Sequence, residues 1–184
     1  MRLCAGVREM LGQRHRHAHT VRVARLAARL ARAHGLEPQQ ALLAGLLHDL
    51  ARLYSPERLL DECRARGMAF DAFERSHPMV LHARLGAELA REYFGIRDEI
   101  VLDAIRSHTL AAGRMSRTAV IVYLADSVEP GRDYAEREQF EKLALRDLDA
   151  AMRAVLASTI AHYSARGDDV APQTSAAVAA FAGG

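Results

Sequence analysis

The sequence has few of the features that mark disulfide-rich, thiolate-metal or membrane proteins. Its two cysteines, Cys4 and Cys63, stand alone and form no CxxC pair, which argues against a disulfide framework and a zinc knuckle. No stretch approaches the ~18 apolar residues that span a membrane. No long apolar run follows Arg2 and Arg8, as it would in a signal peptide. We therefore expect reduced cysteines, a cytoplasmic location and no membrane partner.

Excess charge of one sign is also scarce. The formal net charge is +2, so the overall charge does not call for a nucleic-acid partner. Lys142 is the only lysine among 25 basic residues. Arginine binds phosphate bidentately, so this bias is compatible with a phosphate ligand, although a compositional preference of the genome would produce the same bias. Arginines recur at 22, 25, 29 and 32, and we interpret them as the solvated face of a helix.

Apolar residues recur at helical spacing nearly throughout the 184 residues. His19, Val23, Leu26 and Leu30 follow one another at steps of four, three and four. Start and stop signals divide the pattern: Pro38, Ser55-Pro56, Pro78, Asp98 and Ser116 open helices, and Gly35, Gly67, Gly95 and Gly167 end them. We predict an all-α fold, one domain over 1–184, with roughly seven to nine helices.

Two segments leave alternatives open. The run "AVIVYLA" at 119–125 has strand propensity, but its spacing to Asp126 and the lack of a partner strand favour a helix. A long amphipathic helix is predicted from Leu145 to near Gly167, packed on its own core or, alternatively, forming the seam of a homodimer. The small residues of the tail, "SAAVAAFAGG", suggest fraying.

The most informative residues are imidazoles and carboxylates placed at apolar helix faces. An aspartate inside the run "LLHDLAR" at 46–52 costs several kcal/mol if it is buried without a partner. A single histidine on such a face is usually a satisfied core residue. Six groups of this kind occur at or beside apolar stripes: His19, His48, Asp49, His82, His108 and Asp126. A metal ion would satisfy them together, and the absence of thiols favours Fe, Mn, Mg, Zn or Co in a nitrogen–oxygen site.

Five segments together resemble the HD-domain superfamily, and within it the bacterial YqeK-type branch of symmetrical diadenosine tetraphosphate hydrolases. They are "HAHTVRVARLAARLA", "LLAGLLHDLAR", "HPMVLHARLGAELAREYFGI", "AIRSHTLAAGRMS" and "YLADSVEPGR". The resemblance covers about 14–135, with a weaker continuation over 136–184. The ordered series of histidines and aspartates makes it specific, whereas an isolated His-Asp pair would not.

The resemblance implies a helical bundle that binds iron or another divalent transition metal, as one or two ions. It implies cleavage of diadenosine tetraphosphate, a small nucleotide substrate, into two molecules of ADP. The implied metal ligands are His19, His48, Asp49 and Asp126, with His82 and His108 available for a second ion. The implied catalytic residues are Asp49, His82 and His108. The implied substrate contacts are Arg16, His19, Asp49, Arg52, His82, His108, Thr109, Asp126, Arg132 and Thr174.

The sequence departs from the family pattern near its end. Where the family tends to carry His-Pro-x-Thr followed by Arg-Asn, this chain keeps Pro172 and Thr174 but has Ala171 and Ala177-Val178. This departure concerns substrate preference more than chemistry. The alternatives are therefore another nucleotide substrate (a nucleoside monophosphate, a dNTP or a cyclic dinucleotide) and a non-catalytic nucleotide- or metal-binding regulatory module. Glu129-Pro130-Gly131 is interpreted as a turn.

Overall fold

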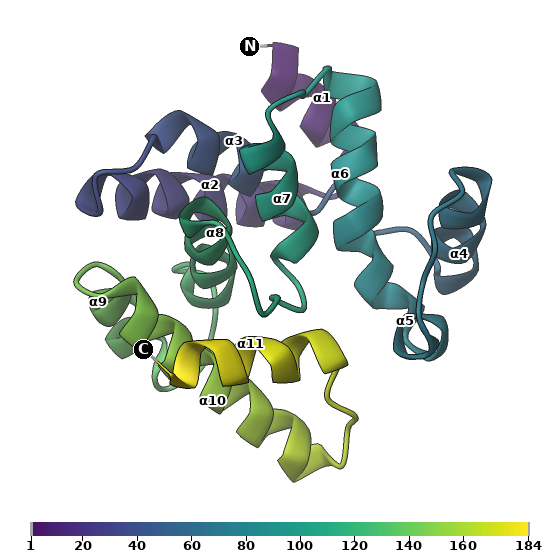
Figure 1. The fold of residues 1–184 in the computed structure, drawn as a ribbon. Coiled ribbons are helices and arrows are strands. Elements are labelled where there is room, and N and C mark those ends of the chain that lie inside the picture. The colour runs from purple at the N-terminus through teal and green to yellow at the C-terminus, as the bar shows by residue number, and fades with distance from the viewer. Residues whose placement is uncertain (1, 184) are drawn as a thin grey trace.

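The computed structural model describes residues 2–183 and consists of helices joined by short connections (Figure 1). This part of the chain contains eleven α-helices, one 3-10 turn and no strand. The all-α prediction is confirmed, and the expected seven to nine helices were too few. The elements are α1 (Arg2–Leu11), α2 (Arg14–Ala33), α3 (Pro38–Leu47), α4 (Pro56–Ala65), α5 (Ala72–Ser76), η1 (Pro78–Val80), α6 (Leu81–Phe94), α7 (Glu99–Ser107), α8 (Arg117–Val128), α9 (Arg137–Ala144), α10 (Leu148–Arg166) and α11 (Pro172–Ala182).

The helices that the sequence did not indicate are short or built from small residues. Helix α5 has five residues and is held by a capping box, in which Asp71 and Glu74 each accept from the other's backbone N–H. Helix α11 occupies the tail that was expected to fray. Figure 1 shows α11 lying along α10, and Ala177 on α11 is fully buried. Packing therefore stabilises a segment whose own sequence gives a weak signal.

The predicted helix boundaries are largely confirmed. Ser55, Asp98 and Ser116 each cap the helix that follows by accepting a backbone N–H with the side chain. Gly95 and Gly167 end α6 and α10 in the left-handed conformation, with φ of 66° and 70°. The run "AVIVYLA" is helical, and it reads as uniformly apolar because α8 is buried on almost every side.

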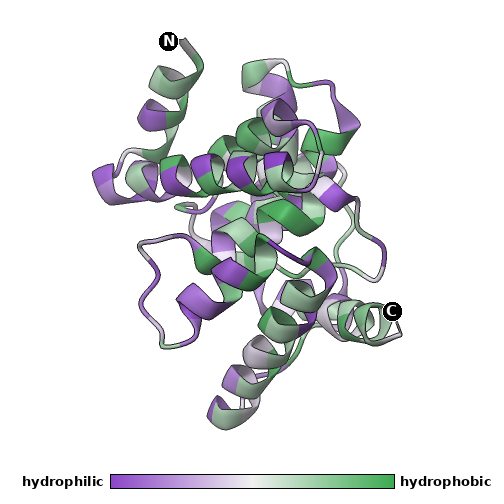
Figure 2. Cartoon of the chain, turned by 90° about the vertical axis from the view of Figure 1, so that its left-hand side faces the viewer, coloured by the Kyte–Doolittle hydropathy of each residue, from purple (hydrophilic) through white to green (hydrophobic). Residues whose placement is uncertain are grey.

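Helices α2, α3, α7 and α8 pack against one another and carry much of the core. The closest approach is at Gly45 on α3: a Cβ there would lie 2.8 Å from the Cα of Ala24 on α2. Glycine at this position lets the two backbones meet, which brings the end of α3 next to α2. In Figure 2 hydrophilic and hydrophobic residues alternate along the helices, as expected for amphipathic helices around a shared core.

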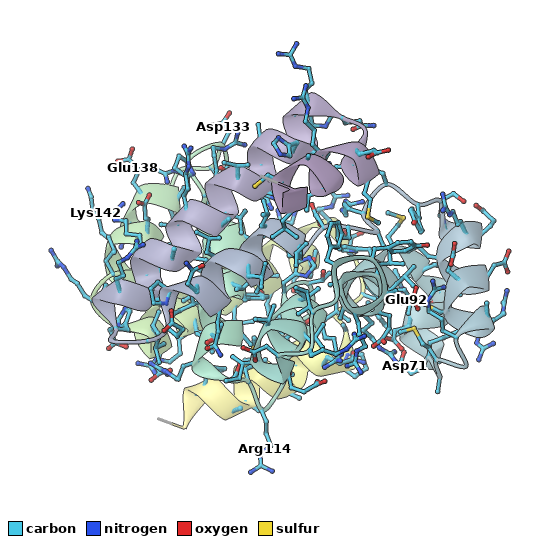
Figure 3. The ribbon with its side chains drawn as sticks, turned by 90° about the horizontal axis from the view of Figure 1, so that it is seen from above. Asp71, Glu92, Arg114, Asp133, Glu138 and Lys142 are labelled. Carbon is cyan, nitrogen blue, oxygen red and sulfur yellow. The ribbon has the colours of Figure 1, made fainter. Side chains whose placement is uncertain are left out.

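Several charged side chains extend outward at the periphery, among them Arg114, Glu138 and the single lysine, Lys142 (Figure 3). In the described part of the chain, no helix is both long and apolar enough to span a membrane.

Candidate metal centre and adjoining cavity

Five helices bring the six predicted imidazoles and carboxylates together. His19 lies on α2, His82 on α6 and Asp126 on α8. His48 and His108 are the C-caps of α3 and α7, and Asp49 follows His48. All are buried except Asp126, whose side chain is 19 % exposed. Residues separated by more than 100 positions in the sequence therefore share one buried cluster.

Three of the histidines are held in the same way. The Nδ1 atoms of His48, His82 and His108 each donate to the carbonyl oxygen three residues earlier, at 2.7, 2.5 and 2.8 Å respectively. A carbonyl oxygen only accepts, so Nδ1 carries the proton in each ring. In the neutral ring the opposite nitrogen, Nε2, is then a bare lone pair. Fixing a histidine through its second nitrogen in this way is the usual arrangement of metal ligands.

These Nε2 lone pairs point toward one another. The Nε2 atoms of His82 and His108 are 3.1 Å apart, and the hydroxyl of Thr109, 3.2 and 3.1 Å away, can donate to only one of them. Nε2 of His48 is buried and has no hydrogen-bond partner among the described residues. Two nitrogens bound tetrahedrally to one ion at about 2.1 Å would be about 3.4 Å apart. The donor set therefore fits a metal ion, because a cation would satisfy lone pairs that the protein leaves unpaired.

The two oxygens of Asp49 face different parts of the cluster. Oδ1 is 3.4 Å from Nε2 of His82 and 3.7 Å from Nε2 of His108. Oδ2 is 3.6 Å from Nε2 of His48 and 3.8 Å from Nε2 of His19. Nε2 of His19 is also 3.1 Å from Oδ1 of Asp126. The carboxylate of Asp49 thus lies between two groups of possible ligands.

Burial and mutual contact set the charges in the cluster. Burial lowers the pKa of His48 to about 4 and also lowers the pKa of His82, so both rings are neutral near pH 7. Burial opposes ionisation of Asp49 and Asp126. The imidazoles around Asp49, and the hydrogen bond from His19 to Asp126, outweigh it and place the pKa of both carboxylates well below the ordinary value. Two ionised carboxylates beside the neutral rings of His48 and His82 suit a divalent cation.

Glu129 is a site residue that was not predicted: its carboxylate accepts a hydrogen bond from Nδ1 of His19 at 3.0 Å. The same carboxylate accepts from the guanidinium of Arg22 and from the backbone N–H of Gly131. Burial would raise the pKa of Glu129, but the hydrogen bonds from Arg22 and His19 lower it to about 2. The interpretation of Arg22 as solvated was therefore incomplete. Glu129 lies within the segment "YLADSVEPGR", three residues after Asp126, and this position was the sequence signal that could have pointed to it.

Asp126 and, to a lesser extent, Glu129 act on the protonation of His19. Burial alone would lower the pKa of His19, but the hydrogen bonds and negative charges of Asp126 and Glu129 raise it above 6.5. A buried carboxylate behind a histidine fixes the ring orientation, and Nε2 of His19 would become a metal ligand by giving up the proton that it donates to Asp126. Gly131 makes room for this arrangement, because a Cβ there would overlap the guanidinium of Arg22.

A cavity of about 640 Å³ adjoins the cluster. Of the ten predicted substrate contacts, all but His19 and Thr174 line it. Three are arginines: Arg16, Arg52 and Arg132. Arg132 forms an ion pair with Asp126. Nη1 of Arg16 lies 3.6 Å from Oδ2 of Asp49, and the buried Nε of Arg16 has no hydrogen-bond partner among the described residues. Cationic forks of this kind bind phosphate oxygens.

Thr174 is the predicted contact that the fold places elsewhere. Its side chain is buried, and its hydroxyl donates to the carbonyl oxygen of Leu110 at 2.8 Å. It connects the start of α11 to the segment that follows Thr109. This contact is structural and leaves no free hydroxyl proton for a ligand.

The chain is similar to known proteins over most of its length. The profile of the HD domain matches residues 16–131. The chain is 35 % identical to a protein of Halalkalibacterium halodurans over 160 residues, covering 87 % of this chain and 85 % of that one. It is 32 % identical to a Bacillus subtilis protein, with 87 % and 86 % covered. Both relatives are named symmetrical bis(5'-nucleosyl)-tetraphosphatase.

A solved structure has the same fold. It is the crystal structure of an HD superfamily hydrolase from Clostridium acetobutylicum, described as involved in NAD metabolism. The TM-score is 0.95 at 30 % sequence identity, and the match covers 99 % of this chain and 96 % of the other. The likeness includes the C-terminal helices, which lie beyond the segment that the HD-domain profile matches.

Proposed function

The chain belongs to the HD-domain family, and on this basis we propose that it is a metal-dependent phosphohydrolase that cleaves diadenosine tetraphosphate symmetrically into two molecules of ADP. The observation that carries the proposal is the convergence of unpaired Nε2 atoms and ionised carboxylates at the edge of an arginine-lined cavity. The names of the two relatives support the choice of substrate. We also propose that 1–184 forms one HD domain, because a single core cluster extends from Val7 on α1 to Ala177 on α11.

The proposed ligands of the first ion are His19, His48, Asp49 and Asp126. Nitrogen and oxygen donors without a thiol suit iron, and also Mn, Co, Zn or Mg. His82 and His108 would hold a second ion together with Oδ1 of Asp49, which faces both of them. A divalent cation in this cluster would lower the pKa of a water molecule and withdraw charge from a phosphoryl oxygen.

The side chains around the cavity would bind and orient the tetraphosphate. Arg16, Arg52 and Arg132 offer bidentate donors to its oxygens, and the hydroxyl of Thr109 offers another. With one ion bound, the free Nε2 of His82 or His108 would accept the proton of the attacking water. Positioning and charge stabilisation would supply most of the rate enhancement, because hydrolysis of a phosphoanhydride needs no covalent intermediate.

Symmetrical cleavage has a simple balance of atoms. The oxygen of water bonds to one inner phosphorus, and the bond from that phosphorus to the central bridging oxygen breaks. The bridging oxygen leaves with the other half of the molecule, so each half ends as ADP. This outcome requires the inner phosphorus to lie closest to the cluster, which the arginines would ensure.

Metal analysis combined with a nucleotide panel tests the proposal. We expect bound transition metal in the purified protein, and ADP as the only first product from diadenosine tetraphosphate. Asp49→Asn should lower metal content and reduce turnover by about 100-fold or more, the scale of losing a preorganised electrostatic contact. The matched control is Asp61→Asn, a change at an exposed aspartate on α4 that pairs with Arg64.

Other outcomes would contradict the proposal in specific ways. AMP and ATP as first products would mean attack at an outer phosphorus. Activity on a mononucleotide or cyclic dinucleotide, with none on dinucleoside polyphosphates, would assign a different substrate. Metal and ADP binding without turnover on any nucleotide would indicate a regulatory module.

A further inference from the structure

The cavity has an aromatic end. The chain contains five tyrosines, five phenylalanines and no tryptophan. Four of these ten aromatic residues line this one cavity: Tyr123, Tyr134, Phe140 and Tyr163. They come from α8, the connection that follows it, α9 and α10, which lie together in the fold (Figure 1). Four of the chain's ten aromatic residues thus line the cavity that adjoins the cluster.

Part of this aromatic wall is exposed yet fixed. Tyr134 is 37 % exposed, but its side-chain hydroxyl donates to the carbonyl oxygen of Ser127 at 3.0 Å. Its ring lies 6.2 Å from that of Phe140, centroid to centroid, and Phe140 is anchored in the core. An aromatic face held open to a cavity is a surface on which a nucleobase can stack.

Polar groups for a base edge accompany the rings. Val155, Ser158, Thr159 and His162 line the same cavity and occupy positions i, i+3, i+4 and i+7 along α10, so one face of that helix borders it. The side chains of Ser158 and His162 have no hydrogen-bond partner in the part of the chain that the structure describes. Aromatic faces with uncommitted polar side chains at their edge are what a nucleoside site requires.

The other side of the cavity is different in kind. There the lining comes from Arg16 on α2, Arg52 after α3, and Thr109 after α7. None of the described lining residues on α2, α6 or α7 is a tyrosine or phenylalanine. Arg132 donates a hydrogen bond to Asp126 of the cluster and lies two residues before Tyr134 in the sequence, so it connects the two parts of the lining. Only one end of the cavity therefore suits a base, and the rest suits phosphates.

We propose that the aromatic end binds one nucleobase of the substrate and that the second nucleoside has no comparable site. This inference rests on the proposed function and deepens it. The phosphates would run from the bound nucleoside past Arg132 to the cluster, so that the second phosphorus from that nucleoside meets the cluster. What is attached beyond this phosphorus is then bound only through its phosphates.

A direct consequence is activity on adenosine 5'-tetraphosphate, which carries one nucleoside. The oxygen of water bonds to the β-phosphorus, and the bond from that phosphorus to the β–γ bridging oxygen breaks. The bridging oxygen leaves with the outer two phosphates, giving ADP and pyrophosphate. A protein that required two bases would cleave this compound poorly.

The experiment compares three substrates that carry two, one or no nucleosides: diadenosine tetraphosphate, adenosine 5'-tetraphosphate and inorganic tetraphosphate. We expect KM values for the first two within about threefold of each other, and a KM for the third that is about tenfold higher or more, the effect of one stacked base. Tyr134→Ala should raise KM for both nucleotides by about tenfold and change that for inorganic tetraphosphate by less than about twofold. Tyr134→Phe keeps the ring and should retain most of the affinity. Tyr93→Ala, at a tyrosine that is 65 % exposed on α6 and outside the cavity, is the matched control.

Two results would overturn the inference. A KM for adenosine 5'-tetraphosphate that is tenfold or more above that for diadenosine tetraphosphate would reveal a second base site. An equal effect of Tyr134→Ala on all three substrates would mean that Tyr134 supports the fold and does not bind a base.

Calorimetry separates this inference from the proposed function. If the wild-type protein does not hydrolyse diadenosine tetraphosphate, ADP and pyrophosphate can still be titrated into it and into Tyr134→Ala. Weaker ADP binding by the variant, with pyrophosphate binding unchanged, would support the base site. Equal affinity of the wild-type protein for ADP and pyrophosphate would overturn it.

Discussion

Replacing Glu129 by glutamine tests whether a residue outside the predicted ligand set controls the metal centre. The Glu129 side chain is 2 % exposed and accepts hydrogen bonds from His19, Arg22 and Gly131. Its pKa of about 2 means that it is ionised at any pH suited to an assay. Glutamine has the same shape, but it has no charge and offers one acceptor oxygen where the carboxylate offers two.

The structure sets the size of the expected effect. Four N–H groups face the two oxygens of Glu129: Nδ1–H of His19, two from Arg22 and one from Gly131. With an amide in place of the carboxylate, an NH₂ group must face at least one of these donors. Loss of such an outer partner typically weakens metal binding by about 10- to 100-fold, which is about 1.4–2.7 kcal/mol. We therefore expect Glu129→Gln to lower metal affinity within this range while the fold persists.

The assay is competition between the metal-free protein and a chromophoric chelator, with helicity measured by circular dichroism. Glu141→Gln is the matched control, because Glu141 also accepts from two arginines, Arg29 and Arg137, but lies on α9 outside the cluster. Metal affinity within about twofold of wild type in a folded Glu129→Gln protein would refute the reasoning, since it lies far below the expected loss. Equal losses in Glu129→Gln and Glu141→Gln would indicate a general effect on the fold.

Much of the fold could be predicted because its signals are local. Ser116 and Asp98 are capping residues whose role depends on their own turn, and Gly95 ends α6 because it adopts a positive φ there. Helix α5, in contrast, depends on a tertiary contact. Its capping glutamate, Glu74, is buried against the guanidinium of Arg84, which is a tertiary contact. Short helices are marginal alone, so packing decides whether they form.

The candidate site also has residues that the sequence predicted and residues that it did not. The six imidazoles and carboxylates were recognisable because polar residues at apolar helix faces are unusual, and His48 next to Asp49 made this plain. Glu129 could not be recognised in this way, because it follows the end of α8 and precedes Pro130-Gly131, a sequence that ordinarily forms a turn. Only the contact with His19, 110 residues away, reveals its role. The aromatic end of the cavity had no sequence signal either, since Tyr134 and Tyr163 lie on separate elements.

Three further predictions concern the metal and the packing that positions it. Removing metal with a chelator should lower the melting temperature by roughly 5–10 °C. A ligand at 100 times its Kd stabilises the folded protein by about 2.7 kcal/mol, and each kcal/mol shifts Tm by about 2–4 °C in a protein of this size. An unchanged Tm in a thermal scan would argue against a metal bound in the cluster. Gly45→Ala should lower the free energy of unfolding by about 1–3 kcal/mol, measured by urea denaturation, because the added Cβ overpacks against Ala24. Gly183→Ala is the control and should leave this free energy unchanged, because a Cβ there meets nothing within 4 Å. The last prediction distinguishes one ion from two: Asp126→Ala should lower metal content and turnover together, because its carboxylate contacts His19 in the first group of ligands. His108→Ala should keep the first ion and lose about 100-fold in turnover if its Nε2 serves only the phosphate or the proton. Half the wild-type metal content in His108→Ala would instead establish a second ion, and normal turnover would remove His108 from the reaction.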